Sequence, residues 1–298
     1  MKPTAIITSD IGLQEGQPIC RLDDYWAAQG YKLAWLKALQ EEYDVPILDA
    51  GDLFEHWKPS PYLLRWVLEN LSDGIITIPG NHDLPAHNLD LYEKSGLAVL
   101  EAAGKIEVLK QGDVKDMNHE VFVYSFPWGV EPTGLSESRR PDVYHVALVH
   151  AMTYIGRSYP GCRDPGALQL LKKMEGYDLI IVGHNHQHFM VNYKGRKLIS
   201  PGSLTRTTAD QIDYEPHVFL WYAETNDIEA IPVPIEKGVI SREHIDAVER
   251  KDERIDAFVS RLSGEMEIGL SFEQNLENYF GTHRTRSSVK DLVWGSVK

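Results

Sequence analysis

Short runs of β-branched and aliphatic residues recur along this chain, and several are separated by stretches with helical periodicity. Such alternation is typical of the α/β class. We predict strands over Ala5–Ser9, Val45–Ala50, Ile75–Ile78, Val121–Phe126, Val143–Val149, Leu179–Val182, Lys197–Ser200, Val218–Tyr222 and Ile228–Val233. We predict helices over Tyr25–Tyr43, Pro61–Leu71, Leu89–Ala103 and Pro165–Glu175, with Asp164 as the N-cap of the last.

Five of the predicted strands run directly into side chains that can bind a metal ion. In open α/β sheets, ligands bind outside the carboxyl ends of the strands, so these five loops can converge on one crevice. One such ending means little, but five that carry only Asp, Asn and His are hard to assign to chance. The residues are Asp10, Asp52, Asn81-His82-Asp83, His150 and the pair His184/His186.

The ligand types indicate a class of metal and a class of reaction. Carboxylate, amide and imidazole donors without thiolate suit Mn²⁺, Fe²⁺ or Zn²⁺. A set this large can serve two ions. Two ions about 3.5–4 Å apart stabilise both the attacking and the leaving oxygen of a phosphoryl displacement, and they supply hydroxide near neutral pH. The pattern therefore favours phosphoester hydrolysis.

Five segments resemble, in order, the motifs of the calcineurin-like metallophosphoesterase superfamily: Thr8–Asp10, Gly51–Glu55, Gly80–Asp83, Val149-His150 and Gly183–His186. The resemblance implies an α/β sandwich of two mixed β-sheets flanked by helices, to which we add a small C-terminal helical segment.

Two further segments, Trp57–Pro61 and Ser200–Arg206, are similar to those of the SbcD-type DNA repair nucleases and their phage-encoded relatives. This narrower resemblance implies a Mn²⁺-dependent exonuclease and endonuclease subunit acting in DNA repair and recombination. It also implies a partner, an SbcC-like ABC-type ATPase that carries a long coiled coil.

Carried over position by position, the resemblance implies a role for each motif residue. Asp52 would bridge two divalent ions, with Mn²⁺ expected and Mg²⁺, Fe²⁺ or Zn²⁺ as alternatives. The other ligands of one ion would be Asn81, His150 and His184, and those of the other ion Asp10 and His186. His82 would contact the scissile phosphate or protonate the leaving group. Asp83 would orient its ring, because a carboxylate bonded to one ring nitrogen fixes which nitrogen carries the proton.

The chain departs from the family pattern at Gly12, where the motif Asp-x-His has its histidine. Glycine offers no side-chain donor, so the ion at Asp10 and His186 loses one ligand. Losing a residue that only supports a ligand already costs about 10–100-fold in metal affinity or activity. We therefore hypothesise a weakened first metal site, either natural or engineered at position 12.

A change of architecture near residues 234–238 predicts a catalytic domain over residues 1–236 and a C-terminal helical cap or partner-binding segment over residues 237–298. Ser241–Leu262 reads as a charged helix whose aliphatic face favours a homodimer contact, and shorter helices are expected over Phe272–Phe280 and Val289–Trp294.

The formal net charge of −14 excludes a protein that holds nucleic acid by a broad basic surface. DNA binding must then be local, metal-assisted or shared with a partner, and Arg206 and Tyr154 are candidates to contact substrate. His188 is a further candidate for contact with the metal.

No apolar run approaches the roughly 20 residues that span a bilayer, and no signal-peptide pattern opens the sequence, so we expect a cytoplasmic protein without a membrane segment.

Two alternatives remain open at this level. A stand-alone phosphodiesterase or phosphatase acting on small or nucleotide substrates needs no basic surface. A catalytically weak assembly module would follow if the missing ligand at Gly12 disables the first site.

Overall fold

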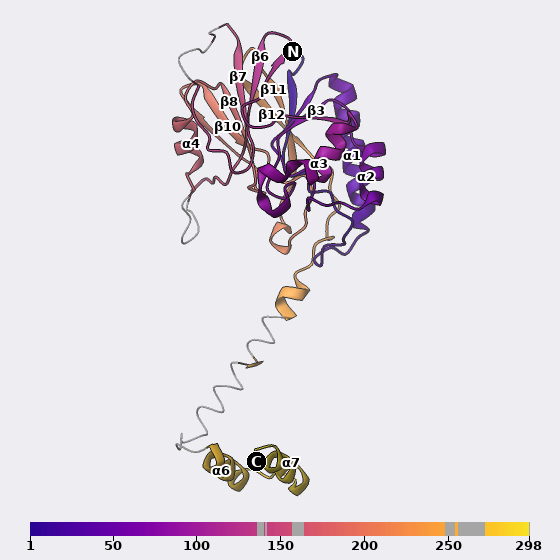
Figure 1. Ribbon diagram of the computed structural model, residues 1–298, viewed down its shortest axis with the longest axis vertical. Coiled ribbons are helices and arrows are strands. Elements are labelled where there is room, and N and C mark those ends of the chain that lie inside the picture. The colour runs from indigo at the N-terminus through magenta and orange to yellow at the C-terminus, as the bar shows by residue number, and fades with distance from the viewer. Residues whose placement is uncertain (136–139, 141, 157–163, 248–253, 256–271, 298) are drawn as a thin grey trace. The chain divides into compact units, whose positions relative to one another are not determined.

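The computed structural model describes residues 1–135, 140, 142–156, 164–247, 254–255 and 272–297 (Figure 1). The chain divides into two compact units, Met1–Ser241 and Arg242–Lys298. The division falls a few residues beyond the boundary that the sequence predicts.

Two six-stranded mixed sheets form the centre of the first unit. In the first sheet β1 to β4 are parallel and β11 and β12 are antiparallel to them, in the order β12 (Asp227–Pro232), β11 (His217–Tyr222), β1 (Ala5–Thr8), β2 (Ile47–Asp49), β3 (Ile75–Thr77) and β4 (Ile106–Val108). In the second sheet β6, β7, β8 and β10 are parallel and the edge strands antiparallel, in the order β5 (Val114–Met117), β6 (Val121–Phe126), β7 (Tyr144–His150), β8 (Leu179–Gly183), β10 (Arg196–Ser200) and β9 (Phe189–Tyr193).

Helices cover the outer faces of both sheets, which confirms the predicted sandwich. Figure 1 shows α1 (Tyr25–Tyr43), α2 (Pro61–Asn70) and α3 (Gly96–Ala102) on one side and α4 (Ala167–Lys173) on the other. The apolar core accordingly has three layers. The middle layer lies between the sheets and includes Ile7, Leu48, Val146 and Ile181. Alternate residues of each strand thus face the other sheet and a helix.

The structure corrects several predicted elements. The helix expected over 89–103 is interrupted: the 3₁₀ helix η2 spans Leu89–Lys94, and α3 starts afresh with Ser95 as its N-cap, whose Oγ accepts from the Ala98 amide. Helix α4 begins after Gly166 rather than Asp164. Sequence analysis missed β4, β5 and β9, which are short or lie at a sheet edge, where half-exposed residues give little apolar signal.

The described residues of the C-terminal unit include the helices α6 (Phe272–Thr282) and α7 (Ser287–Val297), and residues 243–247 are helical as well. The Phe280 and Trp294 rings lie 6.4 Å apart, and Lys290 Nζ donates to the Phe280 carbonyl. Most of the helix predicted over 241–262 lies outside the described residues. None of the helices in the described ranges is long and apolar enough to cross a bilayer.

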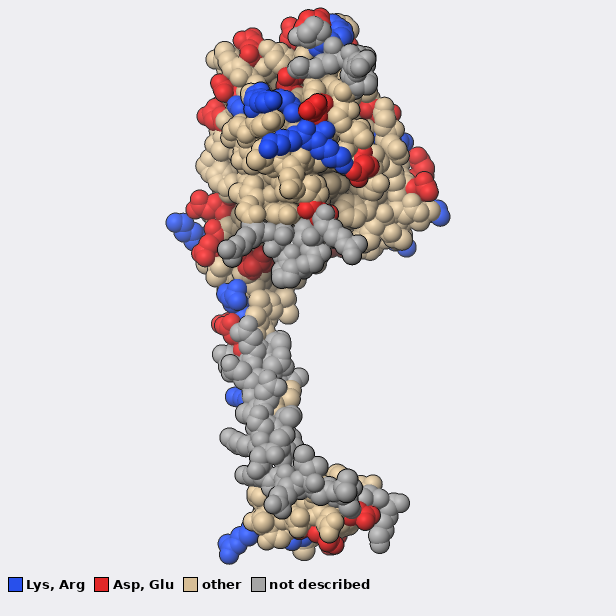
Figure 2. Space-filling view, turned by 90° about the vertical axis from the view of Figure 1, so that its left-hand side faces the viewer, with Lys and Arg blue, Asp and Glu red and all other residues tan. Residues whose placement is uncertain are grey.

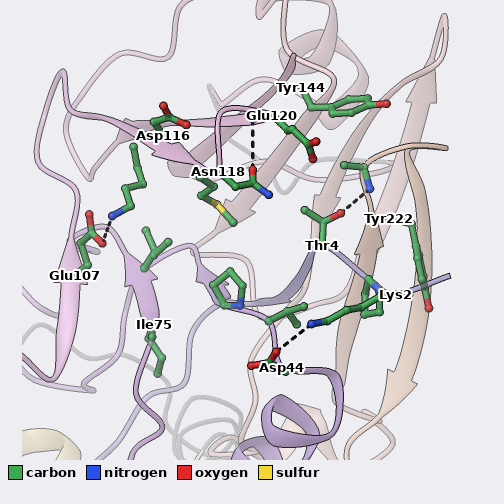
Figure 3. Close-up of a pocket in the computed structure, with 18 of the residues that line it drawn as sticks. Lys2, Thr4, Asp44, Ile75, Glu107, Asp116, Asn118, Glu120, Tyr144 and Tyr222 are labelled. Atoms are coloured by element: carbon green, nitrogen blue, oxygen red, sulfur yellow. Dashed lines mark hydrogen bonds and ion pairs between the residues drawn. The ribbon is translucent and has the colours of Figure 1, made fainter. Parts of the chain in front are cut away.

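A cavity of about 780 Å³ lies at the amino-terminal end of the strands (Figure 3). Lys2 and Thr4, which line it, precede β1, and Ile75, also in its lining, begins β3. None of the five polar strand endings lines it, so this cavity is at the wrong end of the sheets for the predicted chemistry.

Helix α1 is tied to the loop after β10 by a buried lysine. The Lys32 side chain is 5% exposed, and its Nζ donates a 2.6 Å hydrogen bond to the Leu204 carbonyl. Burial first, and then the cations Arg206 and Arg21, lower the pKa of Lys32 to about 7. Between about pH 7 and 10 the unfolded chain therefore binds a proton that the folded chain does not, so this group adds stability as the pH rises.

We expect the free energy of unfolding to increase by about 1.4 kcal/mol per pH unit relative to Lys32→Met across that window. Below about pH 7 both the folded and the unfolded chain carry the proton, so the difference in stability should no longer change with pH. Urea denaturation of both proteins at several pH values measures the difference. A difference that stays constant with pH would show that Lys32 remains charged in the fold.

Candidate metal centre

The carboxyl ends of β1, β2 and β3 are held together by a buried aspartate. Asp49 accepts hydrogen bonds from Thr8 Oγ1 at 2.9 Å and Thr77 Oγ1 at 2.7 Å, and also from the Gly51 amide. Thr8, Asp49 and Thr77 come two, three and four positions before Asp10, Asp52 and Asn81 in the sequence. The strands therefore deliver Asp10, Asp52 and Asn81 to the same edge of the sheet.

Two glycines permit the loops to approach one another closely. A Cβ at Gly80 would collide with the backbone and carboxylate of Asp52, and a Cβ at Gly183 would collide with the Ala50 carbonyl and lie 2.9 Å from His150 Nδ1. Only glycine fits where one loop backbone lies against another. Gly183 also brings the second sheet into contact with the first at this point.

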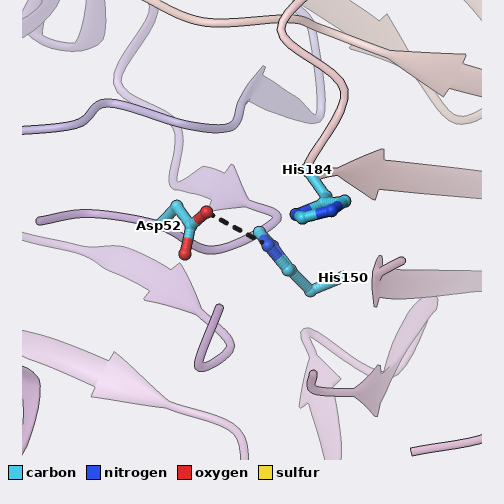
Figure 4. Close-up of side chains that lie close together, drawn as sticks. All are labelled: Asp52, His150 and His184. Carbon is cyan, nitrogen blue, oxygen red and sulfur yellow. Dashed lines mark ion pairs between the residues drawn. The ribbon is translucent and has the colours of Figure 1, made fainter. Parts of the chain in front are cut away.

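Four of the predicted ligands converge from both sheets. Asn81 Oδ1 lies 3.0 Å from His150 Nε2 and 2.7 Å from His184 Nδ1, and His150 Nε2 lies 3.2 Å from Asp52 Oδ2. Figure 4 shows Asp52, His150 and His184 directed toward one another; their ligand atoms lie within 4.8 Å of each other. Ligands that lie 29 to 132 residues apart in the sequence thus form one cluster.

The cluster fits a divalent cation. Asp52 is 4% exposed, and its Oδ2 has no hydrogen-bond partner although it lies near His150. Among the described residues the charge on this buried oxygen is balanced by the His150 ring, and a cation held there would satisfy the oxygen directly. His150 Nδ1 faces the Ala50 carbonyl at 2.7 Å, which leaves Nε2 directed at the cluster. This is how a backbone carbonyl fixes the tautomer of a metal-binding histidine.

The electrostatics of the two histidines differ. Burial favours the neutral form of both, but the carboxylates of Asp52 and Asp10 raise the pKa of His150 to about 9. Burial and the adjacent His150 lower the pKa of His184 to about 4. Without metal, a proton on His150 therefore supplies the positive charge that this acidic pocket requires, and a cation bound there takes its place.

The second group of predicted ligands lies beside this cluster. Asp10 is 2% exposed, its two oxygens accept from the His184 amide, and its Oδ1 lies 3.8 Å from His186 Nε2. Asp10, Asp52 and His186 line a small cavity of about 10 Å³, which has room for about one water-sized particle. The loop after β8 therefore joins both groups.

The structure corrects the role expected of Asp83. Its buried carboxylate accepts from the amides of Asp52, Phe54 and Gly80, at 2.9, 3.1 and 3.0 Å. The His82 ring is held instead by the Glu55 carbonyl, 2.8 Å from Nδ1. Asp83 therefore fastens the two loops together, and a backbone carbonyl orients the imidazole. His82 is half-buried, and its Nε2 is the ring nitrogen left for substrate.

Arg206, one of the two residues expected to contact substrate, is buried within the fold. Arg206 is 4% exposed, and its guanidinium donates to the carbonyls of Ile212 and Glu236. Its neighbours Thr205 and Thr207 line the small cavity, whereas Arg206 is not among the lining residues. Tyr154 forms an isolated bridge with Gly166. These contacts give Arg206 a role within the fold rather than at the substrate.

Two residues, Trp128 and Glu55, lie beside the metal ligands, and this position was not predicted from the sequence. The Trp128 ring lies 4.9 Å from that of His184 and covers the cluster from one side. Glu55 ends the motif Gly51–Glu55, and its side chain lines the small cavity. Its place in that motif was the only signal in the sequence. His188 packs against His217 and Tyr214.

Solved structures with similar folds include phosphoesterases. An archaeal phosphodiesterase is 15% identical (TM-score 0.39; 76% of this chain, 98% of that one). A putative 5′-nucleotidase from Staphylococcus aureus, in complex with alpha-ketoglutarate, is 14% identical (0.48; 84% and 58%), and a 5′-nucleotidase precursor from Thermus thermophilus is 14% identical (0.46; 89% and 60%). No curated protein sequence matches the chain.

The family itself is established by the sequence profile of the calcineurin-like phosphoesterases, which matches residues 4–188. That range contains all five polar strand endings and every ligand of the cluster described above. The chain therefore belongs to the calcineurin-like phosphoesterase family and is a hydrolase of phosphoester bonds.

Proposed function

We propose that the chain hydrolyses the phosphodiester bonds of DNA at a centre of two divalent ions, as an SbcD-like exonuclease and endonuclease subunit. The observation that supports the ion centre is the buried Asp52 carboxylate, whose Oδ2 accepts no hydrogen bond and lies 3.2 Å from His150 Nε2 in the ligand cluster, while Asp52 also lines the small cavity beside Asp10. Ions bound there would supply a hydroxide nucleophile and stabilise the charge that develops on the phosphate.

Protein side chains would then bind the phosphate and transfer a proton to the leaving oxygen. The Glu55 carbonyl holds His82 with Nε2 available to the phosphate or to the leaving oxygen. A histidine so placed can donate a proton to the leaving group, which contributes typically about 10²–10⁴-fold to the rate. Trp128 limits the motion of the metal-binding rings by packing against them.

A local basic surface supports a nucleic-acid substrate despite the net charge of −14. Figure 2 shows Lys and Arg side chains gathered on the face that includes α4. The α4 helix and the β9–β10 hairpin carry Lys172, Lys173, Lys194, Arg196 and Lys197. The Nζ atoms of Lys172 and Lys194 lie 5.0 and 5.3 Å from the centre of the Tyr193 ring. Lys173 pairs with Glu131 and Lys197 with Asp227, so Lys172 and Lys194 are the exposed members of this cluster. The β9–β10 turn is at the amino-terminal end of β10, away from the metal ligands that follow β8, so this surface would bind phosphates beyond the cleaved bond, by releasing counterions.

The surface of the C-terminal unit is evidence for binding to another protein. Its helices expose large apolar side chains, with Phe272 65% and Leu292 73% exposed. Exposed apolar residues on a small helical unit are typical of a protein-binding surface. We propose an SbcC-like ABC-type ATPase with a coiled coil as this partner, with homodimerisation as a second use of the same unit.

The substrate is tested by offering three phosphodiesters with Mn²⁺: linear duplex DNA, circular single-stranded DNA and bis(p-nitrophenyl) phosphate. We expect all three to be cleaved, and cleavage of the DNA substrates to fall when Lys172 and Lys194 are both changed to Gln. Cleavage of the small ester alone would overturn the nuclease proposal and favour a phosphodiesterase of small substrates, which the acidic balance of the chain suits. Inactivity on all three, also in Gly12→His, would favour an assembly module.

A further inference from the structure

The space left by the missing histidine at position 12 faces a carboxylate. Gly12 has φ +63°, and a Cβ built on it would have Glu55 Oε2 as its nearest neighbour, at 3.5 Å. The backbone fixes this arrangement, because residues 10–13 and 51–55 run side by side. Gly12 N donates to the Asp52 carbonyl at 3.0 Å, and Glu55 N donates to the Leu13 carbonyl at 3.1 Å.

Glu55 shares the small cavity with the residues of the first ion site. Gly12, Asp10, Asp52 and His186 line the cavity together with Glu55. The Glu55 Oε1 atom lies 4.0 Å from His82 Nδ1, beyond hydrogen-bond distance, and no hydrogen bond to its carboxylate is found among the described residues. The Glu55 carboxylate thus has only this long ion pair with His82 among the described residues, and its oxygens can serve as metal ligands.

A second observation supports a cation at this cavity. Asp52 borders the cavity and is 96% buried, and its Oδ2 accepts no hydrogen bond, with His150 Nε2 3.2 Å away as its nearest charged group. Burial raises the pKa of Glu55, while His82 and His186 oppose the rise and Asp52 and Asp10 add to it. The Glu55 carboxylate is thus within electrostatic reach of the residues that would hold the ion.

We propose that Glu55 is a ligand of the first metal ion and takes the place of the histidine that the family has at position 12. The inference rests on the proposed two-ion centre and names one of its ligands. The first site then has three carboxylates, from Asp10, Asp52 and Glu55, and one imidazole, from His186. Oxygen-rich sites favour Mn²⁺ and Mg²⁺ over Zn²⁺. The site is altered rather than weakened.

The test counts bound ions without using activity. Mn²⁺ binding to the full-length chain is measured by equilibrium dialysis, and electron paramagnetic resonance shows whether two bound ions are magnetically coupled. The variants are Glu55→Gln, which keeps the shape and the backbone carbonyl that holds His82, and Glu55→Ala. The matched control is Glu41→Gln, which removes the same charge from an exposed position on α1. Circular dichroism confirms folding of each.

We expect the native chain and the control to bind two coupled Mn²⁺ ions. Both Glu55 variants should bind one ion normally and the second at least about 10-fold more weakly, without the coupled signal. Two coupled ions with unchanged affinity in both Glu55 variants would overturn the inference and leave the proposed function intact. A single ion in the native chain would overturn the two-ion centre and with it the role of Glu55.

Discussion

Asp52→Asn should lower the rate of phosphodiester hydrolysis by more than about 100-fold, because losing even a residue that only orients a metal ligand costs about 10–100-fold. Asp52 borders both ligand groups, and its Oδ1 is already engaged by the His82 amide at 2.8 Å. An amide in its place removes the negative charge that two cations would share. Hydrolysis of bis(p-nitrophenyl) phosphate at saturating Mn²⁺ measures the loss.

The same variant should lose the stabilisation that Mn²⁺ gives to the fold. An ion at 100 times its Kd stabilises a protein by about 2.7 kcal/mol, which a thermal melt detects. Asp49→Asn is the matched control, since Asp49 is a buried carboxylate three residues away whose partners are Thr8, Thr77 and Gly51. It should melt at a lower temperature but keep its response to Mn²⁺. Equal loss of that response in both variants would mean that loop geometry, and not ligation, explains the effect.

His82→Ala should reduce kcat by about 10²–10⁴-fold while the number of bound ions stays the same. The reason is structural: the His82 ring is anchored to the Glu55 carbonyl and is not one of the side chains that converge on Asn81 Oδ1. Steady-state kinetics and equilibrium dialysis with Mn²⁺ separate the two effects. Loss of metal in the variant would place His82 among the ligands.

The leaving group distinguishes the two roles open to His82. If Nε2 protonates the leaving oxygen, the variant should lose little activity on a nitrophenyl ester, whose leaving group needs no proton, and much on DNA. If Nε2 contacts the phosphate instead, the activity of the variant should fall by the same factor on both substrates. His56→Ala is the control, because His56 is an exposed imidazole next to Glu55 and bonds only locally, to the Lys58 amide.

The sequence predicted the architecture well where the signal was local. Helix α1 runs over the predicted range Tyr25–Tyr43, and β8, predicted over Leu179–Val182, spans Leu179–Gly183. Buried parallel strands are apolar throughout, and this makes them easy to find. The break at Ser95 within the expected helix was missed, since a serine inside a helical pattern is read either as a cap or as an interior residue until the packing of its neighbours decides.

The sequence by itself also determined which side chains meet at the site. Polar residues placed directly after buried strands must gather at one edge of the sheet, so Asp10, Asp52, Asn81, His150 and His184 could be named in advance. The hydrogen bonds and contacts that hold the residues around them could not be predicted. The backbone amides that Asp83 accepts from, the direction in which Arg206 points, and the approach of Glu55 to Gly12 depend on how two loops pack face to face. Those distances are set by contacts between residues far apart in the chain, and no local pattern encodes them.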